Sequence, residues 1–442
     1  MLDGLAEHCA EALRVHGCPS VSVAVAERGE VVLAEAYGPA DVAAGIPATP
    51  GTAYALASVT KAVTAVAVCL AADDGLLDLD EPVPGGRRPA APTVRQLLQH
   101  RGGFGAHYDF HYDDGEPPID AEPYAAPFRE PGVAFEYANL GYRALGQLLE
   151  SATGRSLAEF VRERVSEPLG LTDWHLGPSY PGPAPVAVKY TVDGRAYPAR
   201  CATNHPGATE GWATATDLVR FAQGYGSLLK PETAAAVRAA LPLNARLGYG
   251  LGWVVSNGDG PVVQSHGGGM GGVAAMLATV PGQRLSVAVL TNSTAKAARD
   301  AVVEHVLTAL VPEFTADLIS PVIDDPARPV DLPPGRWTGT VGTPEGRLPL
   351  TLELLADHTA VLRLSSGERA TAPATATRAY DLRAAFPLQL PTTDARLAGP
   401  ELGLELRLDQ GRLTGAARAF KNGDATGLLG SFLSHPCTLH PA

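Results

Sequence analysis

The stretch Tyr54-Ala-Leu-Ala-Ser-Val-Thr-Lys61, which continues into the apolar residues 62–72, predicts a buried helix around which the rest of the chain is organised. Ser58 and Lys61 are three residues apart, so on a helix their side chains share one face. A serine hydroxyl is a weak nucleophile unless a base lies beside it. A lysine in apolar surroundings loses solvation, which makes its neutral form accessible, and the positive potential of a helix N-terminus favours negative charge developing there. The stretch therefore predicts a nucleophile paired with its base.

The Ser-x-x-Lys spacing is not specific by itself, because it occurs three times in the chain. Only Ser58 opens a long apolar segment, whereas the other two serines lie at the end of a helical pattern and in a polar turn. The simpler interpretation of Ser58 is that it caps the helix, so the assignment depends on motifs further along. The three pairs are Ser58/Lys61, Ser227/Lys230 and Ser293/Lys296.

The composition predicts a soluble globular protein. Of 442 residues, 45% are hydrophobic and 18% are charged, and a chain of this length allows two or three domains. The formal net charge of −13 argues against nucleic acid or an anionic membrane surface as partner. The longest apolar run is too short to cross a bilayer, and the acidic N-terminal residues do not resemble a secretion signal. We expect a cytoplasmic protein whose partner is a small-molecule or peptide substrate, free or bound to a carrier protein.

The cysteines give no sign of a disulfide framework or a zinc knuckle. They are odd in number, scattered, and contain no Cys-x-x-Cys pair, which fits a reducing compartment. We expect neither a metal nor a cofactor. The five cysteines are Cys9, Cys18, Cys69, Cys201 and Cys437.

The order of hydrophobic patterns predicts an α+β fold in which strands from both ends of the first domain join one antiparallel sheet. A helix and a hairpin come first, helices fill the middle, and strands followed by a helix close the domain. The expected helices cover residues 2–16, 58–75, 93–100, 140–151, a segment starting at the Ser156 capping box, 217–223 (capped by Thr216 or Asp217) and 295–310. The expected strands cover residues 20–26, 31–37, 250–256, 261–264, 272–280 and 284–291.

The composition and the hydrophobic pattern of the chain change after residue 312. Residues 312–335 are rich in proline and aspartate and predict a linker. Leucines then alternate with other residues over 348–354 and 404–408, which is typical of half-buried strands. We expect a first domain at 1–312, a linker at 313–332 and a small β domain at 333–442.

Residues 104–134 predict a long loop, because proline, glycine, aspartate and aromatic residues alternate there without a period. Histidines four apart with carboxylates between them could bind a metal, but no helix holds them in place. The rim of a polar cleft is the simpler interpretation. The polar residues in question are His107, Asp109, His111, Asp113 and Asp114.

Two further motifs carry chemistry. Tyr137-Ala-Asn139 precedes a helix: a tyrosine beside a lysine ammonium ionises more easily, so Tyr137 could act as base, and Asn139 could bind a substrate amide or cap the helix. The glycine-rich residues 265–272 follow a strand and would let a substrate backbone approach closely. No Gly-Lys-Ser/Thr follows, which argues against a phosphate loop. The alternatives are that residues 265–272 form a glycine-rich turn in which the histidine is incidental, or that the functional His-x-Gly motif is His205-Pro-Gly207.

Together the motifs have the order and spacing of one family: Ser58-x-x-Lys61, Tyr137-x-Asn139 and His266-x-Gly268. The chain resembles the serine β-lactamase and penicillin-binding-protein superfamily, nearest the class C β-lactamases, DD-peptidases and D-aminopeptidases. The resemblance covers roughly residues 5–311, and the region from 335 onward resembles the lipocalin-like β domain that some members carry.

The resemblance implies a mixed antiparallel sheet with flanking helices beside an all-helical subdomain, and an acyl-enzyme mechanism. Ser58 would attack a carbonyl, while Lys61 and Tyr137 move protons. The backbone N–H groups of Ser58 and Gly269 would form the oxyanion hole. The candidate catalytic residues are Ser58, Lys61, Tyr137 and His266, and the candidate substrate-binding and oxyanion residues are Asn139, Gly267, Gly268 and Gly269.

Departures from the family pattern narrow the function. His266 stands where β-lactamases have lysine, and Gly267 lacks the hydroxyl that often contacts a substrate carboxylate. We expect a serine hydrolase or acyltransferase acting on peptide or (thio)ester carbonyls with D-amino-acid character, such as a penicillin-binding-protein-type thioesterase that releases and cyclises nonribosomal peptides. The alternatives are a D-aminopeptidase or D-amino-acid amidase and a biosynthetic esterase or transesterase. A β-lactamase, a DD-carboxypeptidase and a non-catalytic ligand binder rank below these.

Overall fold

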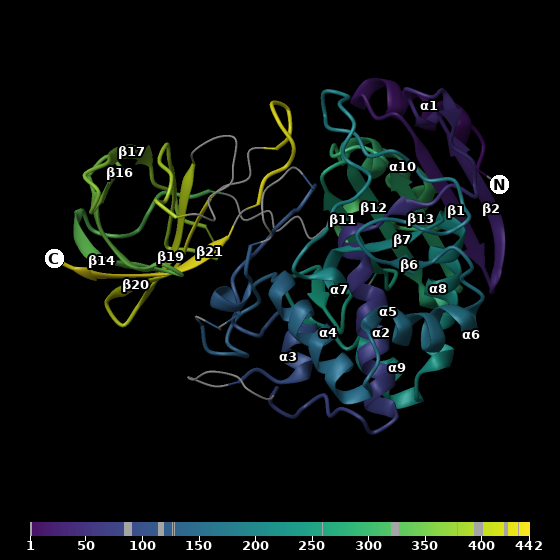
Figure 1. The fold of residues 1–442 in the computed structure, drawn as a ribbon, viewed down its shortest axis with the longest axis horizontal. Helices are drawn as coiled ribbons and strands as arrows, with labels where there is room; N and C mark the ends of the chain where they lie inside the picture. The colour runs from purple at the N-terminus through teal and green to yellow at the C-terminus, as the bar shows by residue number, and fades with distance from the viewer. Residues whose placement is uncertain are drawn as a thin grey trace.

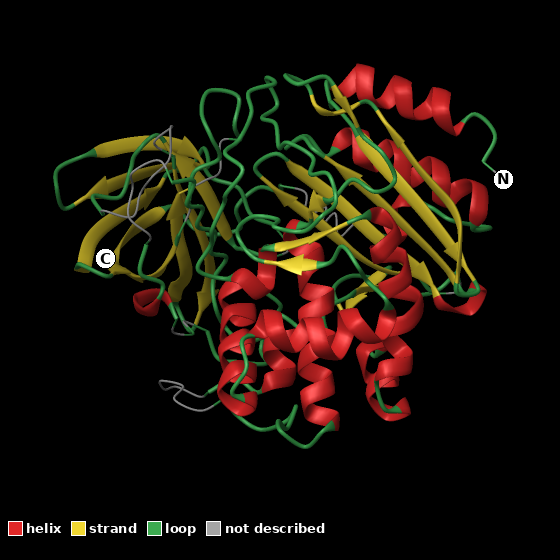
Figure 2. Ribbon diagram, turned by 45° about the vertical axis from the view of Figure 1, so that its right-hand side comes forward, coloured by secondary structure: helices red, strands yellow, loops and turns green. Residues whose placement is uncertain are grey.

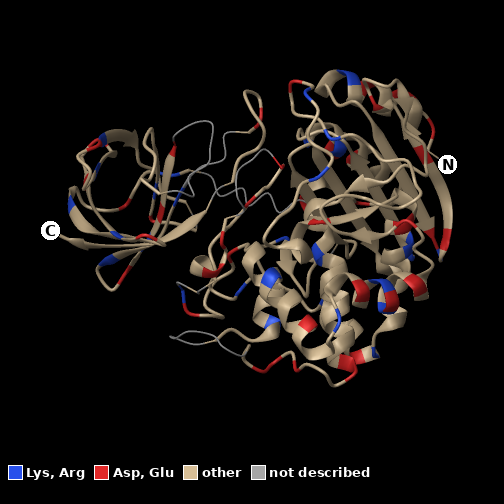
Figure 3. Ribbon diagram, in the orientation of Figure 1, with Lys and Arg blue, Asp and Glu red and all other residues tan. Residues whose placement is uncertain are grey.

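The computed structural model describes residues 2–83, 91–113, 119–125, 127, 129–258, 260–319, 327–377, 379–392, 401–419, 423–431 and 433–442. These residues form two bodies: a large α+β part and a smaller part made of strands (Figure 1). Lys, Arg, Asp and Glu are interspersed over the outer helices and strands of both (Figure 3). Along the parts of the chain that the structure describes, no helix combines the length and apolarity needed to span a membrane.

The large part is built on an antiparallel sheet of order β2-β1-β13-β12-β11-β10-β9-β8. Strand β1 pairs with β13 over its whole length, from Val21 opposite Thr291 to Glu27 opposite Leu285. The prediction that strands from both ends of this domain share one sheet is therefore confirmed. The strands are β1 (Val21–Glu27), β2 (Glu30–Tyr37), β3 (Pro39–Asp41), β4 (Ile46–Pro47), β5 (Tyr54–Ala55), β6 (His175–Leu176), β7 (Gly211–Ala213), β8 (Leu241–Pro242), β9 (Leu247–Tyr249), β10 (Val254–Ser256), β11 (Gln264–Met270), β12 (Val273–Val280) and β13 (Leu285–Thr291).

Helices cover both faces of this sheet (Figure 2). Alternate residues of β1 explain why: Val23 and Val25 pack with α1 and α10, whereas Ala24 and Ala26 face the core that contains α2 and α8. The helices are α1 (Leu5–His16), α2 (Thr60–Asp73), α3 (Val94–Leu98), α4 (Asn139–Thr153), α5 (Leu157–Val161), α6 (Glu167–Leu169), α7 (Pro206–Thr209), α8 (Ala215–Leu228), α9 (Pro231–Arg238) and α10 (Ala297–Leu310), with short turns η1 (Ala57–Val59), η2 (Glu122–Tyr124), η3 (Arg162–Ser166), η4 (Pro281–Gln283) and η5 (Ala316–Leu318).

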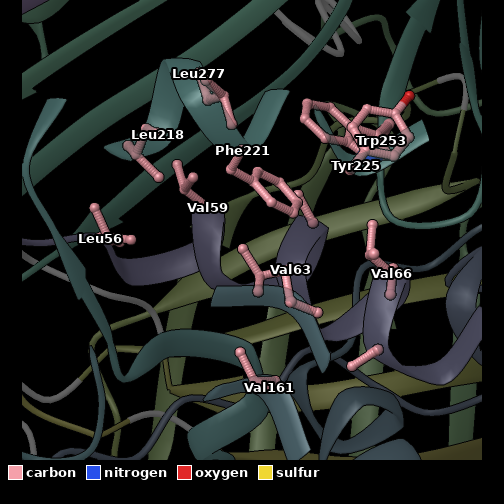
Figure 4. Close-up of a cluster of buried hydrophobic side chains, with 14 of the residues drawn as sticks. Leu56, Val59, Val63, Val66, Val161, Leu218, Phe221, Tyr225, Trp253 and Leu277 are labelled. Carbon is pink, nitrogen blue, oxygen red and sulfur yellow. The ribbon is translucent and has the colours of Figure 1, made fainter. Parts of the chain in front are cut away.

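Helix α2 is the buried helix that the sequence predicts. Every residue from 60 to 71 is buried. Val63 and Val66 lie beside the rings of Phe221 and Trp253 (Figure 4), which stack with their centroids 6.2 Å apart. Burying a side chain of this size contributes about 1.5–3 kcal/mol. Packing therefore fixes the helix, which has no side-chain cap.

Some local predictions are wrong, each for a specific reason. The expected strand over 250–256 shortens to β10, because Gly252 adopts a φ of 81° and makes a turn after β9. The expected strand over 261–264 instead begins at Gln264 and runs through the glycines, so the third motif lies inside β11. Helix α8 begins before residue 217, because Thr214 is extended and its side chain accepts a hydrogen bond from the Asp217 N–H.

The second part is an eight-stranded antiparallel sheet of order β17-β16-β15-β14-β21-β20-β19-β18, which we call the barrel domain. Its edge strands meet where Thr375 and Arg383 exchange backbone hydrogen bonds of 2.9 and 2.6 Å, which nearly closes the barrel. Alternating leucines fill its interior, as the pattern predicts. The strands are β14 (Gly335–Thr343), β15 (Gly346–Leu354), β16 (Thr359–Leu364), β17 (Arg369–Pro373), β18 (Leu382–Phe386), β19 (Leu402–Asp409), β20 (Arg412–Ala419) and β21 (Ser434–Pro441). The expected domain limits at 312 and 333 stay predictions, and residues 320–326 of the expected linker lie outside the described residues.

Candidate active site

Ser58 lies in η1, the tight turn that leads into α2, rather than in the α-helix itself. The turn holds Ala57 at a φ of 46°, in the left-handed region, which costs a residue other than glycine about 1–2 kcal/mol. The Thr60 hydroxyl donates to the Ala57 carbonyl at 2.6 Å and accepts from the Gly211 N–H at 2.9 Å. These bonds hold the turn so that Ser58, 6% exposed, reaches a cavity.

Lys61 is fully buried one turn later, as the spacing predicts. Its Nζ donates to Ser58 Oγ at 3.1 Å and to the Ala208 carbonyl at 3.0 Å. The same nitrogen lies 4.7 Å from the ring centroid of Tyr137 and 5.6 Å from that of Tyr142. Burial lowers the pKa of Lys61 well below its usual value, so the neutral amine is accessible beside the serine.

Tyr137 reaches the same point from the extended segment before α4. Burial, together with the nearby Tyr108 and Tyr249, raises its pKa well above 10, although a hydrogen bond with Ser58 opposes the shift. The ring of His100 packs against it with centroids 4.2 Å apart. The phenol is therefore neutral at rest, which differs from the expectation that a neighbouring ammonium would ionise it.

Asn139 lies outside the cavity lining, although the motif predicts a substrate contact. It is fully buried at the start of α4, and its Nδ2 donates to the His107 carbonyl at 2.8 Å. It does not cap the helix. In this structure Asn139 anchors the long loop to α4.

His266 is a neutral hydrogen-bonded side chain. Its Nδ1 lies 2.8 Å from the Gly267 carbonyl, so this nitrogen carries the proton and donates. Nε2 then accepts from the Tyr249 hydroxyl at 3.1 Å. Burial and the charge of Lys61 lower the pKa of His266 to about 3. The histidine therefore does not supply the positive charge that a lysine would bring to this position.

The three glycines after His266 differ in how much room each has for a side chain. A Cβ on Gly268 would lie 2.1 Å from the Leu56 carbonyl oxygen, so only glycine lets β11 pack against the turn that carries Ser58. A Cβ on Gly269 would meet the side chain of Lys296 at 2.6 Å. A Cβ on Gly267 would have its nearest neighbour at 3.4 Å, which is ordinary contact.

Strand alternation shows where the backbone groups of β11 point. The Ser256 N–H donates to the Val263 carbonyl at 2.9 Å, so Val263 faces β10. Backbone groups of alternate residues face the same side of an antiparallel strand, so Ser265, Gly267 and Gly269 also face that side. Pairing with β10 ends at Ser265. The N–H of Gly269 is therefore left at an edge of β11 that no described strand pairs, as the oxyanion-hole prediction requires.

Two cationic side chains that the sequence reasoning missed line the same cavity, which has a volume of about 480 Å³. Arg299 donates from one terminal nitrogen to the carbonyls of Gly268 at 3.2 Å and Ala275 at 3.0 Å, and pairs with Asp300. Lys296 lies across Gly269, and burial lowers its pKa. The sequence signal for Lys296 was the third Ser-x-x-Lys pair, Ser293/Lys296. That spacing suggests a base for Ser293, whereas Lys296 lines the Ser58 cavity.

The serines of the other two Ser-x-x-Lys pairs make hydrogen bonds with the backbone. Ser227 Oγ donates to the Gly224 carbonyl at 2.7 Å, and Lys230 Nζ donates to the Asp73 carbonyl. Ser293 Oγ accepts from a backbone N–H two residues on. Of the three Ser-x-x-Lys pairs, Ser58 and Lys61 are the pair joined by a hydrogen bond.

Three of the polar residues of the long loop, His107, Asp109 and His111, form a buried cluster, so the interpretation as a cleft rim is wrong for these three. Asp109 is fully buried, with His111 Nε2 and His205 Nε2 each 2.9 Å from its oxygens and His107 Nε2 at 3.6 Å. Burial raises the pKa of Asp109, but the charge of His205 and hydrogen bonds from the histidines outweigh it and lower the pKa well below the usual value. The Asn204 N–H also donates to Asp109 at 2.8 Å.

The cluster ties the loop to the segment before α7. Within the described ranges, no group of His, Cys, Asp and Glu side chains is arranged to hold a metal ion. Asp113 pairs with Arg200 at 2.8 Å instead. Asp114 lies outside the described residues.

A segment of the barrel domain, residues 423–431, lies against this loop, and we call it the strap. It follows β20 and reaches the large part of the molecule (Figure 1). The Phe110 N–H donates to Ser431 Oγ at 3.0 Å, and the Tyr112 hydroxyl donates to the Leu429 carbonyl at 3.0 Å. Leu429 also packs in one apolar cluster with both aromatic side chains. The loop that carries Tyr108 to the cavity is therefore braced from the barrel domain.

Asp424 anchors the strap on its other side. Its carboxylate, 1% exposed, accepts hydrogen bonds from the Tyr197 hydroxyl at 2.7 Å, from the Val192 N–H at 3.2 Å and from the Thr294 hydroxyl. Each donor belongs to the large part of the molecule. A single buried carboxylate thus joins the strap to two separate loops beside the sheet.

The chain is similar to several known proteins. The family model described as Beta-lactamase matches residues 5–310. A D-aminopeptidase of Cereibacter sphaeroides is 27% identical over 63% of this chain, and the chain spans only 58% of that protein. The unguisins hydrolase ungD' of Aspergillus campestris is 25% identical over 80% of this chain and 78% of its own length. A solved structure of SurE with D-Leu is 25% identical, covers 91% of this chain and 97% of that one, and superposes with a TM-score of 0.63.

Proposed function

The chain belongs to the beta-lactamase family of serine hydrolases, and from this premise we propose that it transfers acyl groups through a covalent intermediate on Ser58. One observation carries the proposal: Lys61 Nζ, buried and disposed to be neutral, lies 3.1 Å from the Ser58 hydroxyl oxygen. An amine in this state is a base within reach of the proton that must leave. A non-catalytic binder would gain nothing from burying a lysine whose described hydrogen-bond partners, Ser58 Oγ and the Ala208 carbonyl, are uncharged.

Acylation uses the groups around Ser58 in a defined order. Lys61 takes the proton as Ser58 Oγ attacks the carbonyl carbon, and the developing oxyanion lies between the N–H groups of Ser58 and Gly269. The intermediate collapses, the bond to the leaving group breaks, and the Tyr137 hydroxyl protonates that group. Lys61 then returns its proton to Tyr137. This assigns Lys61 as base and Tyr137 as proton carrier, because burial favours the neutral form of each.

Deacylation reverses the sequence with water or an amine as nucleophile. Tyr137 passes its proton to Lys61 as it takes one from the incoming water or amine, and Lys61 then protonates Ser58 Oγ as the bond to the acyl group breaks, which restores the serine hydroxyl. His266 keeps its proton on Nδ1 and orients Tyr249 at the wall of the cavity. Tyr137 and Lys61 can move the proton of either water or an amine. The acyl acceptor is therefore whichever of the two the cavity binds beside the acyl-enzyme.

The substrate class follows from the walls of the cavity and from the relatives. Lys296 lies across Gly269, and Arg299 donates to the Gly268 carbonyl, so this end of the cavity suits a polar leaving or accepting group. One relative is a D-aminopeptidase and one solved structure holds D-Leu. We infer a peptide thioester or ester with a D-residue at the reacting carbonyl, released by hydrolysis or by cyclisation on its own amine, as in a penicillin-binding-protein-type thioesterase.

Product mass tests this proposal. The enzyme is mixed with a peptidyl thioester ending in a D-residue, beside Ser58→Ala and the epimeric L-substrate. A cyclic product that requires Ser58 supports the cyclising acyltransferase, and a linear acid supports a hydrolase. Turnover that persists in Ser58→Ala would end the assignment of the nucleophile.

The second candidate is a D-aminopeptidase or D-amino-acid amidase. The 27% identity to a D-aminopeptidase favours it, although the chain spans only part of that protein's length. Release of ammonia or of an amino acid from D-residue amides, with thioesters inert, would select this candidate.

A further inference from the structure

A second cavity opens between the large part of the molecule and the barrel domain, with a volume of about 450 Å³. We call it the inter-domain cavity. One wall comes from the segment before α4, which includes Phe135 and Tyr137. The facing wall comes from the barrel domain and includes Tyr380 on the approach to β18 and Glu405 on β19.

The inter-domain cavity adjoins the one that contains Ser58. Tyr108, Phe135 and Tyr137 line both, so these three rings are where a long molecule bound at Ser58 would pass toward the barrel domain. The Ser58 cavity alone, at about 480 Å³, already lies within the range that holds a small ligand. The additional space is suited to a longer substrate.

The charges that line the inter-domain cavity are paired with one another. Glu405, 4% exposed, lies 3.1 Å from Arg383 and 2.8 Å from Arg418. Glu136 pairs with Arg129 at 2.9 Å. Compensated charges of this kind offer hydrogen-bonding edges without a strong net field. Such a surface suits the amides and side chains of a peptide better than a free charged group.

Aromatic faces supply the apolar part of the surface. Phe135 is half-buried on one wall, and Tyr380 is half-buried on the other. The Arg129 guanidinium lies 5.9 Å from the Tyr380 ring centroid, which fixes the ring across the boundary. The opposite end of the Ser58 cavity carries Lys296 and Arg299, so that end suits the leaving or accepting group.

We propose that the inter-domain cavity binds the peptide chain on the acyl side of the reacting carbonyl, so that the substrate is an oligopeptide rather than a derivative of one amino acid. The inference rests on the proposed acyl transfer at Ser58. It gives the barrel domain a direct part in substrate selection, with Tyr380 as a specificity-determining residue.

The experiment measures kcat/KM for thiol release from N-acetylcysteamine thioesters that end in the same D-residue and grow from a single residue to a pentapeptide. The wild-type enzyme should prefer the pentapeptide by about tenfold or more, as remote binding energy is used in acylation. Tyr380→Ala should remove most of that preference, chiefly through KM, and leave the single-residue thioester within about twofold. Tyr380→Phe should behave as wild type. The matched control is Leu355→Ala, an exposed residue of the barrel domain that lines neither cavity.

The outcomes separate this inference from the proposed function. Equal kcat/KM at every length, or an equal loss for short and long substrates in Tyr380→Ala, overturns the inference while leaving acyl transfer intact. No Ser58-dependent release from any thioester overturns the proposed function instead. If Tyr380→Ala does not fold, Ala379→Phe, which narrows the inter-domain cavity, should reduce turnover of the pentapeptide alone.

Discussion

The two sides of the Ser58 cavity are held in different ways. Ser58, Lys61 and the β11 glycines are fixed by regular secondary structure in the most buried part of the molecule. Tyr108 belongs to the long loop over residues 104–134, whose position depends on a buried aspartate–histidine cluster and on the strap, and Tyr137 follows in the extended segment before α4. All residues of the first side lie in the part of the chain that the family model matches. The second side also depends on contacts from the barrel domain. The nucleophile and the aromatic wall opposite it are thus held in place by different parts of the molecule.

The largest effect is expected on the Ser58 side. Lys61→Met should lower the rate of acylation by about 10⁴-fold, since it removes the base and keeps the volume of the side chain. Mass spectrometry of the acyl-enzyme over time measures this rate. The control is Lys230→Met, which alters another Ser-x-x-Lys pair that does not line the cavity. Acylation within tenfold of wild type would contradict the role of Lys61.

The next effect concerns two neighbouring glycines on the same side. Gly268→Ala should lower kcat/KM by about 100-fold, because a Cβ there would lie 2.1 Å from the Leu56 carbonyl oxygen and push β11 away from Ser58. Gly267→Ala is the matched control, because its Cβ meets nothing closer than 3.4 Å. Steady-state kinetics measure both variants. Equal losses would mean that the tight packing of β11 on η1 is not what the reaction requires.

A smaller effect is expected when the loop side loses its support. Asp424→Ala leaves three donors without their acceptor, among them the buried Tyr197 hydroxyl, which should lower the free energy of unfolding by about 2–3 kcal/mol. Because the strap braces the loop, kcat/KM should also fall, by about tenfold. Urea unfolding and kinetics test the two parts, with Asp357→Ala, an exposed turn residue, as control. Full activity in a destabilised variant would show that the strap does not position the loop side for the reaction.

The smallest effect is a pH-dependent gain in stability. Burial holds the pKa of Lys61 well below its value in the unfolded chain. Between those two pKa values the unfolded state binds one proton more, so wild-type stability falls as the pH falls. Lys61→Met removes this dependence and should be more stable than wild type near neutral pH, with an advantage that shrinks as the pH rises toward about 10.4. Urea midpoints across this range measure it, and a variant less stable at every pH would contradict the neutral lysine.

Sequence reasoning found the Ser58 side because its signals are local. An apolar run, a three-residue spacing and a glycine run after a histidine each follow from contacts within one element or between adjacent strands. It misjudged the length of β11, because glycines weaken a strand pattern even where close approach demands them. It also expected Asn139 in the cavity, whereas the His107 carbonyl holds its amide group.

Sequence reasoning named Tyr137, but the contacts that hold the loop side could not be predicted, because they join residues far apart that have no shared period. Lys296 and Arg299 on the Ser58 side were missed for the same reason: they come from the start of α10 and reach β11 only once the sheet has formed. The strap bonds depend on single serine, tyrosine and aspartate side chains, which occur on most surfaces without such a role. Tyr380 becomes part of a cavity only through the placement of one body against the other.

The strap also has a consequence for the order in which the enzyme is made. Phe110 and Ser431 are 321 positions apart. At ribosomal rates of about 5–20 residues per second, roughly 15–60 s pass between the synthesis of the loop and that of its brace. During this interval the nascent chain can form the Ser58 helix while the wall opposite is still unsupported. The loop side of the cavity is therefore completed late in translation, after the elements that carry Ser58 and the β11 glycines have been synthesised.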